Sequence, residues 1–134
     1  MSAARRSARK KRVFISFKYE ERYLKNYLKG QLRNKRTRVL VSDWSLKEGT
    51  PDPDWKTKAR AQIQRSDQVV VVLGKRTYRS AAVRREVKMA REMGKPVCQI
   101  KPASSRGSKT VRGAGRQYNW NQRNLDKILG DSGK

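Results

Sequence analysis

The sequence contains no histidine, one cysteine and few acidic residues. Its 134 residues include 35 Lys or Arg against 11 Asp or Glu, which gives a formal net charge of +24. Without histidine the chain cannot form a Ser-His or Cys-His nucleophilic pair, and it lacks the Cys and His side chains that most structural zinc sites need. We therefore expect no metal site, and any chemistry has to come from carboxylates, hydroxyls and cations.

The single cysteine, Cys98, lies in the apolar run PVCQI. One cysteine excludes a disulfide within the chain. An apolar setting is typical of a buried thiol that behaves as a small hydrophobic side chain. We expect Cys98 to be buried and unreactive.

Long apolar runs and glycine-rich nucleotide motifs are also missing. No segment approaches the roughly 18 apolar residues of a membrane span. Residues 1–12 are basic and are not followed by the apolar stretch of a signal peptide. These features predict a cytoplasmic protein without a membrane contact. The chain contains neither G-x-x-x-x-G-K-[ST] nor G-x-G-x-x-G, which excludes a P-loop and a dinucleotide-binding fingerprint.

Basic residues occur along the whole chain and are concentrated at its two ends. Residues 1–12 contain six Lys or Arg and no acid, and residues 103–134 contain seven Lys or Arg and two acids. We divide the chain into a basic N-terminal arm at 1–12, a folded domain at 13–102 and a basic Gly/Ser/Arg-rich tail at 103–134. A positive field of this kind attracts polyanions, such as nucleic acids or nucleotide phosphates, and the charge alone does not choose between them.

Short apolar runs alternate with helical periods between these ends. Apolar β-branched runs without polar alternation are typical of strands buried on both faces. Four such runs occur, at residues 13–17, 39–41, 68–73 and 97–100. Apolar residues recur at helical spacing in the three intervals between the runs. With right-handed crossovers, this β-α-β-α-β-α-β order predicts an α/β flavodoxin-like fold, in which helices cover both faces of a parallel sheet.

The third helical interval places an acid, Glu86, beside an apolar stripe formed by Val83, Val87 and Ala90. Ser80 is suited to cap the start of the helix, and Gly94 is suited to end it. Beyond the fourth run, residues 102–119 have no apolar period and predict a loop or a partly disordered segment, whereas residues 122–129 predict a short last helix.

Three segments of the chain resemble one protein family. The segments RVFISFKYEERYLKNYL, SDWSLKEGTPDPDWKTKARAQIQRSDQVVVVLG and YRSAAVRREVKMAREMGKPVCQI are similar to the TIR-like domain of the Thoeris antiphage ThsB proteins, in order over residues 12–102. The resemblance implies a TIR-like, flavodoxin-like fold. It also implies cleavage of NAD, as a substrate and not as a cofactor, with cyclisation of the ADP-ribose product into a signal for a partner effector protein.

The resemblance assigns a catalytic role to Glu86. TIR enzymes carry their catalytic glutamate in a Ser-x-x-[apolar]-x-x-Glu pattern after the third strand, and Ser80, Val83 and Glu86 reproduce this spacing. Breaking the bond between nicotinamide and ribose passes through an oxocarbenium-like state, which a nearby carboxylate stabilises. The alternative is that Glu86 only pairs with arginines on a solvated helix face.

Further candidate substrate-binding residues lie after the first two strands, where open parallel α/β sheets bind ligands. Ser16 and Tyr19 either hydrogen-bond a ligand or cap the next helix. Asp43 either accepts a hydrogen bond from a ribose hydroxyl or is a turn residue, and Trp44 either lines a slot for nicotinamide or adenine or packs in the core. Phe17 and Lys18 complete this group, and Ser80, after the third strand, is a further candidate.

Lys18 and Arg85 depart from the family pattern, in which an Asp often follows the first strand and an aromatic residue precedes the glutamate. Both changes add positive charge, which suits a phosphate-rich ligand or marks a domain that has lost activity. TIR relatives often build the active site between two subunits with the loop after the second strand, here residues 45–53, so self-association is expected. The alternative function is a catalytically inactive TIR-like module that binds nucleic acid or a protein partner through its basic surface and tails.

Overall fold

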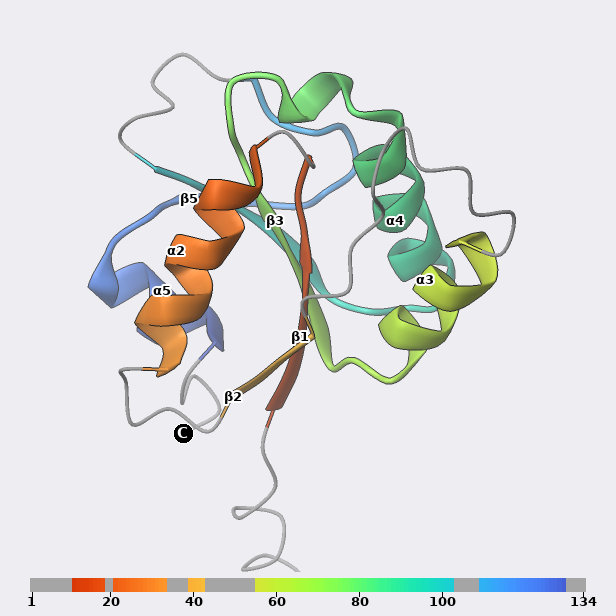
Figure 1. The fold of residues 1–134 in the computed structure, drawn as a ribbon, viewed down its shortest axis with the longest axis horizontal. Coiled ribbons are helices and arrows are strands. Elements are labelled where there is room, and N and C mark those ends of the chain that lie inside the picture. The colour runs from red at the N-terminus through yellow and green to blue at the C-terminus, as the bar shows by residue number, and fades with distance from the viewer. Residues whose placement is uncertain (1–10, 19–20, 34–38, 43–54, 103–108, 130–134) are drawn as a thin grey trace, which may run out of the picture.

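Strands and helices alternate in the predicted order up to residue 101. The computed structural model describes residues 11–18, 21–33, 39–42, 55–102 and 109–129 (Figure 1). The strands are β1 (Lys11–Ser16), β2 (Val39–Ser42), β3 (Gln68–Val72), β4 (Val97–Lys101) and β5 (Gln117–Asn119). The helices are α2 (Arg22–Arg33), α3 (Trp55–Gln64), α4 (Ala81–Glu92) and α5 (Gln122–Leu129), and a short 3-10 helix, η2 (Thr77–Arg79), precedes α4.

The strands form one five-stranded sheet in the order β2-β1-β3-β4-β5. All four pairings are parallel, and the register pairs Phe14 with Val69 and Val70 with Cys98. This strand order is that of flavodoxin-like folds. The predicted fold class is therefore confirmed.

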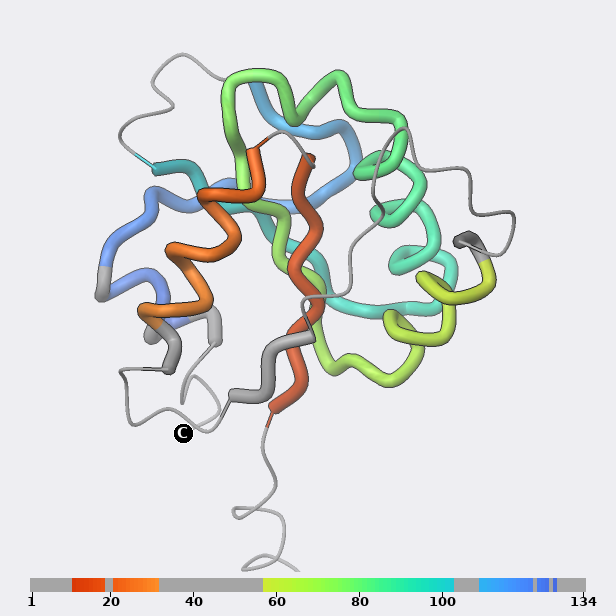
Figure 2. Tube along the Cα trace, viewed as in Figure 1, coloured from red at the N-terminus to blue at the C-terminus, as the bar shows by residue number. Residues whose placement is uncertain are grey.

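Two helices cover each face of the sheet. Figures 1 and 2 show α2 and α5 on one face and α3 and α4 on the other. Alternate side chains of β1 point to opposite faces, since Val13 and Ile15 pack with residues of α2 and α5, whereas Phe14 packs with residues of α3 and α4. By the same alternation, Ser16 faces α4.

Cys98 belongs to the apolar cluster on the side of α2 and α5, and only 6% of its surface is exposed. Burial raises the pKa of its thiol from 9.0 to about 11, partly offset by a hydrogen bond from Gln68 Nε2 and by the charge of Lys11. The same desolvation lowers the pKa of Lys11. The prediction of a buried cysteine is confirmed.

The sheet extends beyond residue 102, the predicted end of the folded domain. The expectation of a loop at 102–119 is wrong for β5, which pairs with β4. Val111 and Ala114 are also buried, in a cluster with residues of β3 and α4. Gln99 of β4 holds this segment, because its Nε2 donates to Gly115 O at 2.8 Å and its Oε1 accepts from Val111 N at 2.7 Å.

The predicted last helix is confirmed, because α5 has the expected bounds. Leu125 of α5 packs into the cluster that contains residues of α2 and β1. Within the described parts of the chain, no helix combines the length and apolar character that a membrane crossing requires.

Candidate functional site

Glu86 lies on the inner face of α4 and has no solvent-exposed surface. Val83 and Ala90, three residues before and four residues after Glu86, lie on the same side of the helix and are buried, as is the adjacent Val87, so Glu86 points into the protein. Glu86 is therefore not part of a solvated helix face. A buried carboxyl group requires hydrogen-bonding partners, because desolvation without them is costly.

One partner of Glu86 is Ser16 at the carboxyl end of β1. Ser16 Oγ donates to Glu86 Oε1 at 2.6 Å, and neither side chain is exposed. The alternation of β1 points Ser16 toward α4, and the parallel sheet brings together residues that are 70 positions apart. The sequence predicted both residues as site candidates, and the structure places them in contact.

Ser80 is the N-cap residue of α4, the helix that carries Glu86. Its side chain accepts a hydrogen bond from Val83 N at 3.2 Å, which confirms the predicted N-cap. At the other end, Gly94 N donates to Arg91 O at 3.0 Å and Lys95 N donates to Ala90 O at 2.9 Å. This pair of bonds is a Schellman motif with Gly94 at φ +71°. Both ends of the helix are thus fixed.

Of the other predicted substrate-binding residues, Phe17 and Lys18 belong to the described part of the chain and three do not. Phe17 is 5% exposed and packs in the cluster with α2 and α5, on the opposite side of the sheet from Glu86, with Lys25 Nζ 5.4 Å from its ring centroid. Lys18 is partly buried, and its carbonyl oxygen accepts from Glu21 N at 2.7 Å. The remaining candidates, Tyr19, Asp43 and Trp44, lie outside the described residues.

A second carboxyl group, not among the predicted site residues, joins the carboxyl ends of β1 and β3. Glu21 Oε1 accepts from Thr77 Oγ1 at 2.7 Å, and Glu21 Oε2 accepts from Arg76 N at 3.1 Å. The same Thr77 oxygen accepts from Gly74 N at 2.7 Å. A Cβ at Gly74 would displace the carboxylate of Glu21 from this position. The signal in the sequence was the acidic pair after the first strand of a very basic chain.

The described residues contain no group of three His, Cys, Asp or Glu side chains that could hold a metal ion. The carboxyl end of the sheet contains two pairs of hydrogen-bonded carboxyl and hydroxyl groups, Glu86 with Ser16 and Glu21 with Thr77, and Glu86, Ser16 and Thr77 are buried. Such groups can stabilise a developing positive charge and accept hydrogen bonds from a sugar.

Comparison with protein families gives the family of the chain. The family model of the Thoeris protein ThsB, TIR-like domain, matches residues 14–107. The chain belongs to this family. A comparison with curated proteins gives no match.

The fold of this family member is also found among solved structures. It is similar to the TIR domains in a structure of the activated Roq1 resistosome directly recognizing the pathogen effector XopQ, with a TM-score of 0.50 and 21% sequence identity. The similarity covers 69% of this chain and 58% of that chain. The chain thus spans less than two thirds of the length of that structure, and at this identity the likeness concerns the fold.

Proposed function

We propose that the chain is a TIR-like enzyme that cleaves NAD and converts the ADP-ribose part into a cyclic or otherwise modified signal in antiphage defence. The observation that carries the proposal is the buried carboxyl group of Glu86, held by Ser16 Oγ at 2.6 Å at the carboxyl end of a parallel sheet. Membership of the ThsB TIR-like family supports it.

In the proposed reaction, the bond between the ribose carbon and the nicotinamide nitrogen breaks, and its electron pair leaves with nicotinamide. Nicotinamide departs as a neutral molecule, so no general acid is needed. The ribose carbon becomes cationic, and the Glu86 carboxylate stabilises this charge. A hydroxyl group of the ADP-ribose part or water then forms the new bond to carbon and releases its proton to the surrounding water. The Ser16 hydroxyl keeps the carboxylate directed toward the reacting ring.

Access to Glu86 has to change during this reaction, because its side chain has no exposed surface in the described state. We therefore expect low activity in the resting protein and higher activity after self-association, in which residues 45–53 of a second copy complete the site. In this proposal, activity rises with protein concentration. NAD is the substrate, and the product acts on a separate effector protein.

The test is nicotinamide release from NAD by the wild-type protein and by Glu86→Gln. Glutamine has nearly the same shape and keeps an oxygen that accepts from Ser16, so the variant is expected to fold. Loss of a charge-stabilising group at the reacting centre typically lowers the rate by about 100-fold or more. Glu92→Gln is the matched control, because it makes the same chemical change at an exposed position of the same helix, and it is expected to keep the wild-type rate.

If the purified protein is silent, the same three proteins are compared by NAD loss in bacteria infected with phage. Equal rates for wild type and Glu86→Gln would remove Glu86 from the mechanism. No turnover of NAD in any of these conditions would favour the alternative, a catalytically inactive TIR-like module that acts by binding.

A further inference from the structure

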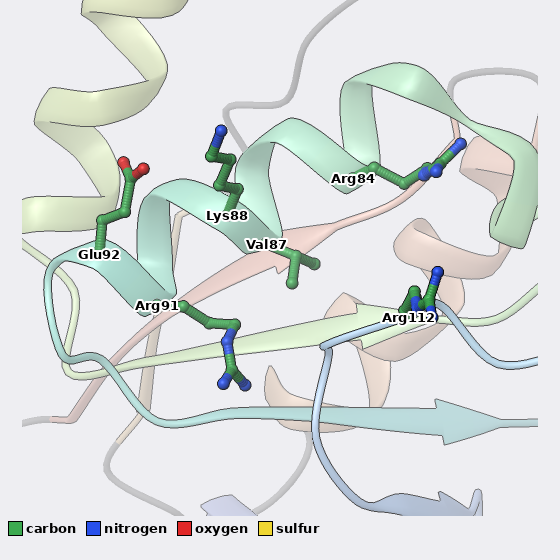
Figure 3. Close-up of a pocket in the computed structure, with 6 residues that line it drawn as sticks. All are labelled: Arg84, Val87, Lys88, Arg91, Glu92 and Arg112. Carbon is green, nitrogen blue, oxygen red and sulfur yellow. The ribbon is translucent and has the colours of Figure 1, made fainter.

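A groove with mainly basic walls runs along the outer side of α4. It has a volume of about 380 Å³ and is lined by Arg84, Val87, Lys88, Arg91, Glu92 and Arg112. Figure 3 shows Arg84 of α4 and Arg112 toward one end of the groove and Arg91 toward the other, whereas the Lys88 side chain points up from α4, away from Arg91 and Arg112. Four of the six lining residues are cations and one is an acid.

The walls of the groove are held in place. Arg91 Nη1 donates to Gly113 O at 3.0 Å, which links α4 to the segment that carries Arg112. Val111 and Ala114 of that segment are buried, and Gln99 binds its backbone. The cations therefore line a preformed surface, which lowers the entropic cost of binding a ligand.

The spacing of the cations fits a ligand with several phosphates. Arg84, Lys88 and Arg91 are four and three residues apart, so they extend over about 10 Å of the helix axis. Along DNA, each strand carries one phosphate per about 3.4 Å of duplex axis, so this length faces several phosphates. Arginine is well suited to such contacts because its planar guanidinium binds phosphate oxygens in pairs.

The groove and the candidate active site use opposite sides of one helix. Glu86 points into the protein toward Ser16, whereas Arg84 and Lys88 are exposed on the outer side. A ligand of the groove therefore does not need to reach Glu86.

We propose that the groove, formed by α4 and the segment around Arg112, binds the phosphate backbone of a nucleic acid. Recognition would be electrostatic and would not depend on base sequence, because the lining offers cations to phosphates. This function is independent of NAD cleavage, and it assigns a role to part of the chain's net charge of +24.

The test measures binding of a short fluorescent DNA duplex by anisotropy, without NAD, over a range of salt concentrations. The groove variant is Arg84→Gln/Lys88→Gln. The matched control is Arg123→Gln/Lys127→Gln on α5, an exposed Arg and Lys pair with the same spacing and the same charge change on the other face of the sheet. Circular dichroism establishes that both variants are folded.

Each lost phosphate contact reduces the slope of log K against log salt by about 0.9. The magnitude of this slope is expected to be about 1.8 smaller for the groove variant. Raising the salt concentration from about 50 to about 200 mM should therefore lower the DNA affinity of the wild-type protein about tenfold more than that of the variant. The control should keep nearly the wild-type slope. Equal loss in both variants would overturn the proposal, because binding would then follow net charge and not the groove.

A competition experiment distinguishes binding of a nucleic acid polymer from binding of a free nucleotide. Unlabelled duplex is expected to displace the labelled duplex fully, whereas ADP at micromolar concentration is expected to leave it bound. Displacement by micromolar ADP would overturn the proposal in favour of a nucleotide site. The assay contains no turnover step, so its outcome does not depend on whether the chain cleaves NAD.

Discussion

At the scale of single residues, the contact between Ser16 and Glu86 is the feature on which the proposed chemistry depends. The position of Glu86 on a helix, beside an apolar stripe, could be predicted from the spacing of Ser80, Val83 and Glu86. Its partner in β1 could not be predicted, because the contact spans 70 residues and follows from the strand order and the register. Glu21 was missed for the same reason, since its partners lie 55 and 56 residues away.

Ser16→Ala is expected to destabilise the protein by about 1–3 kcal/mol, because it removes a hydrogen bond from a buried carboxyl group. Ser66→Ala is the matched control. Ser66 is 2% exposed, and its Oγ donates to the neutral Gln62 O at 2.8 Å, so a smaller loss of about 1 kcal/mol is expected. Urea unfolding of the two variants measures both values. A loss for Ser16→Ala no larger than that for Ser66→Ala would contradict a special contribution of this contact.

The raised pKa of the buried Cys98 thiol predicts that the protein becomes less stable at alkaline pH. The folded thiol keeps its proton up to a pKa of about 11, whereas the thiol of the unfolded chain loses it near 9.0. The stabilisation that follows from this difference is therefore complete below pH 9 and is lost as the pH rises to 11. The loss is on the order of 2–3 kcal/mol.

The measurement compares urea unfolding of wild type and Cys98→Ala at several pH values between 8 and 11.5, a range that spans the two pKa values. Lys11 titrates in both proteins, and its lowered pKa acts in the opposite direction, so the difference between the proteins reports the thiol together with its charge interaction with Lys11. Parallel stability curves for the two proteins would show that Cys98 does not titrate differently on folding.

At the scale of elements, the strands and helices with a clear period were predictable and the rest was not. The apolar runs and helical stripes located β1 to β4 and all four α-helices because each of these segments carries a clear apolar pattern in the sequence. The three-residue strand β5 has no such signal, and it lies in a Gly- and Arg-rich segment. That segment is ordered by tertiary contacts, chiefly from Gln99 to the backbone of Val111 and Gly115.

Three Gly→Ala variants are expected to differ according to the backbone at each site. Gly30 lies inside α2 with open space where a Cβ would lie, so Gly30→Ala should stabilise by about 0.5–1 kcal/mol. Gly94 has φ +71° and open space, so Gly94→Ala should cost about 1–2 kcal/mol. Gly115 has φ +80°, and its Cβ would also collide with the carbonyl oxygen of Val97, so Gly115→Ala should cost more than Gly94→Ala.

Urea unfolding gives the three values on one scale, and Gly94→Ala serves as the control for the backbone effect alone. Equal losses for Gly94→Ala and Gly115→Ala would mean that the segment around Gly115 shifts away from β4 without cost. Such a result would also weaken the view that this segment is a fixed wall of the groove.

At the scale of the whole molecule, the order of elements was sufficient to predict the architecture. Four predicted strands separated by helices lead to a parallel sheet with covered faces, and the right-handed crossover rule leaves few alternatives. The observed order β2-β1-β3-β4-β5 agrees, and it places Ser16, Glu21 and Glu86 toward one end of the sheet. The position of the basic groove could not be predicted, because it depends on the segment around Arg112 that lacks a sequence pattern.

The net charge of +24 predicts that salt stabilises the whole protein. Like charges repel more strongly in the compact state than in the extended chain, and salt screens this repulsion. We expect the Tm to rise by several degrees as sodium chloride increases, since about 1 kcal/mol corresponds to a few degrees for a chain of this size. Scanning calorimetry measures the change, and a Tm that falls with salt would indicate that attractive ion pairs outweigh the repulsion.

The outermost strands of the sheet limit how copies of the chain can associate. The described parts of β2 and β5 contain four and three residues, so each offers only a short row of unpaired backbone groups. Natural proteins use short edge strands to discourage the joining of sheets between molecules. Assemblies of this chain are therefore expected to form through helices and loops, and edge-to-edge aggregation is disfavoured by the architecture itself.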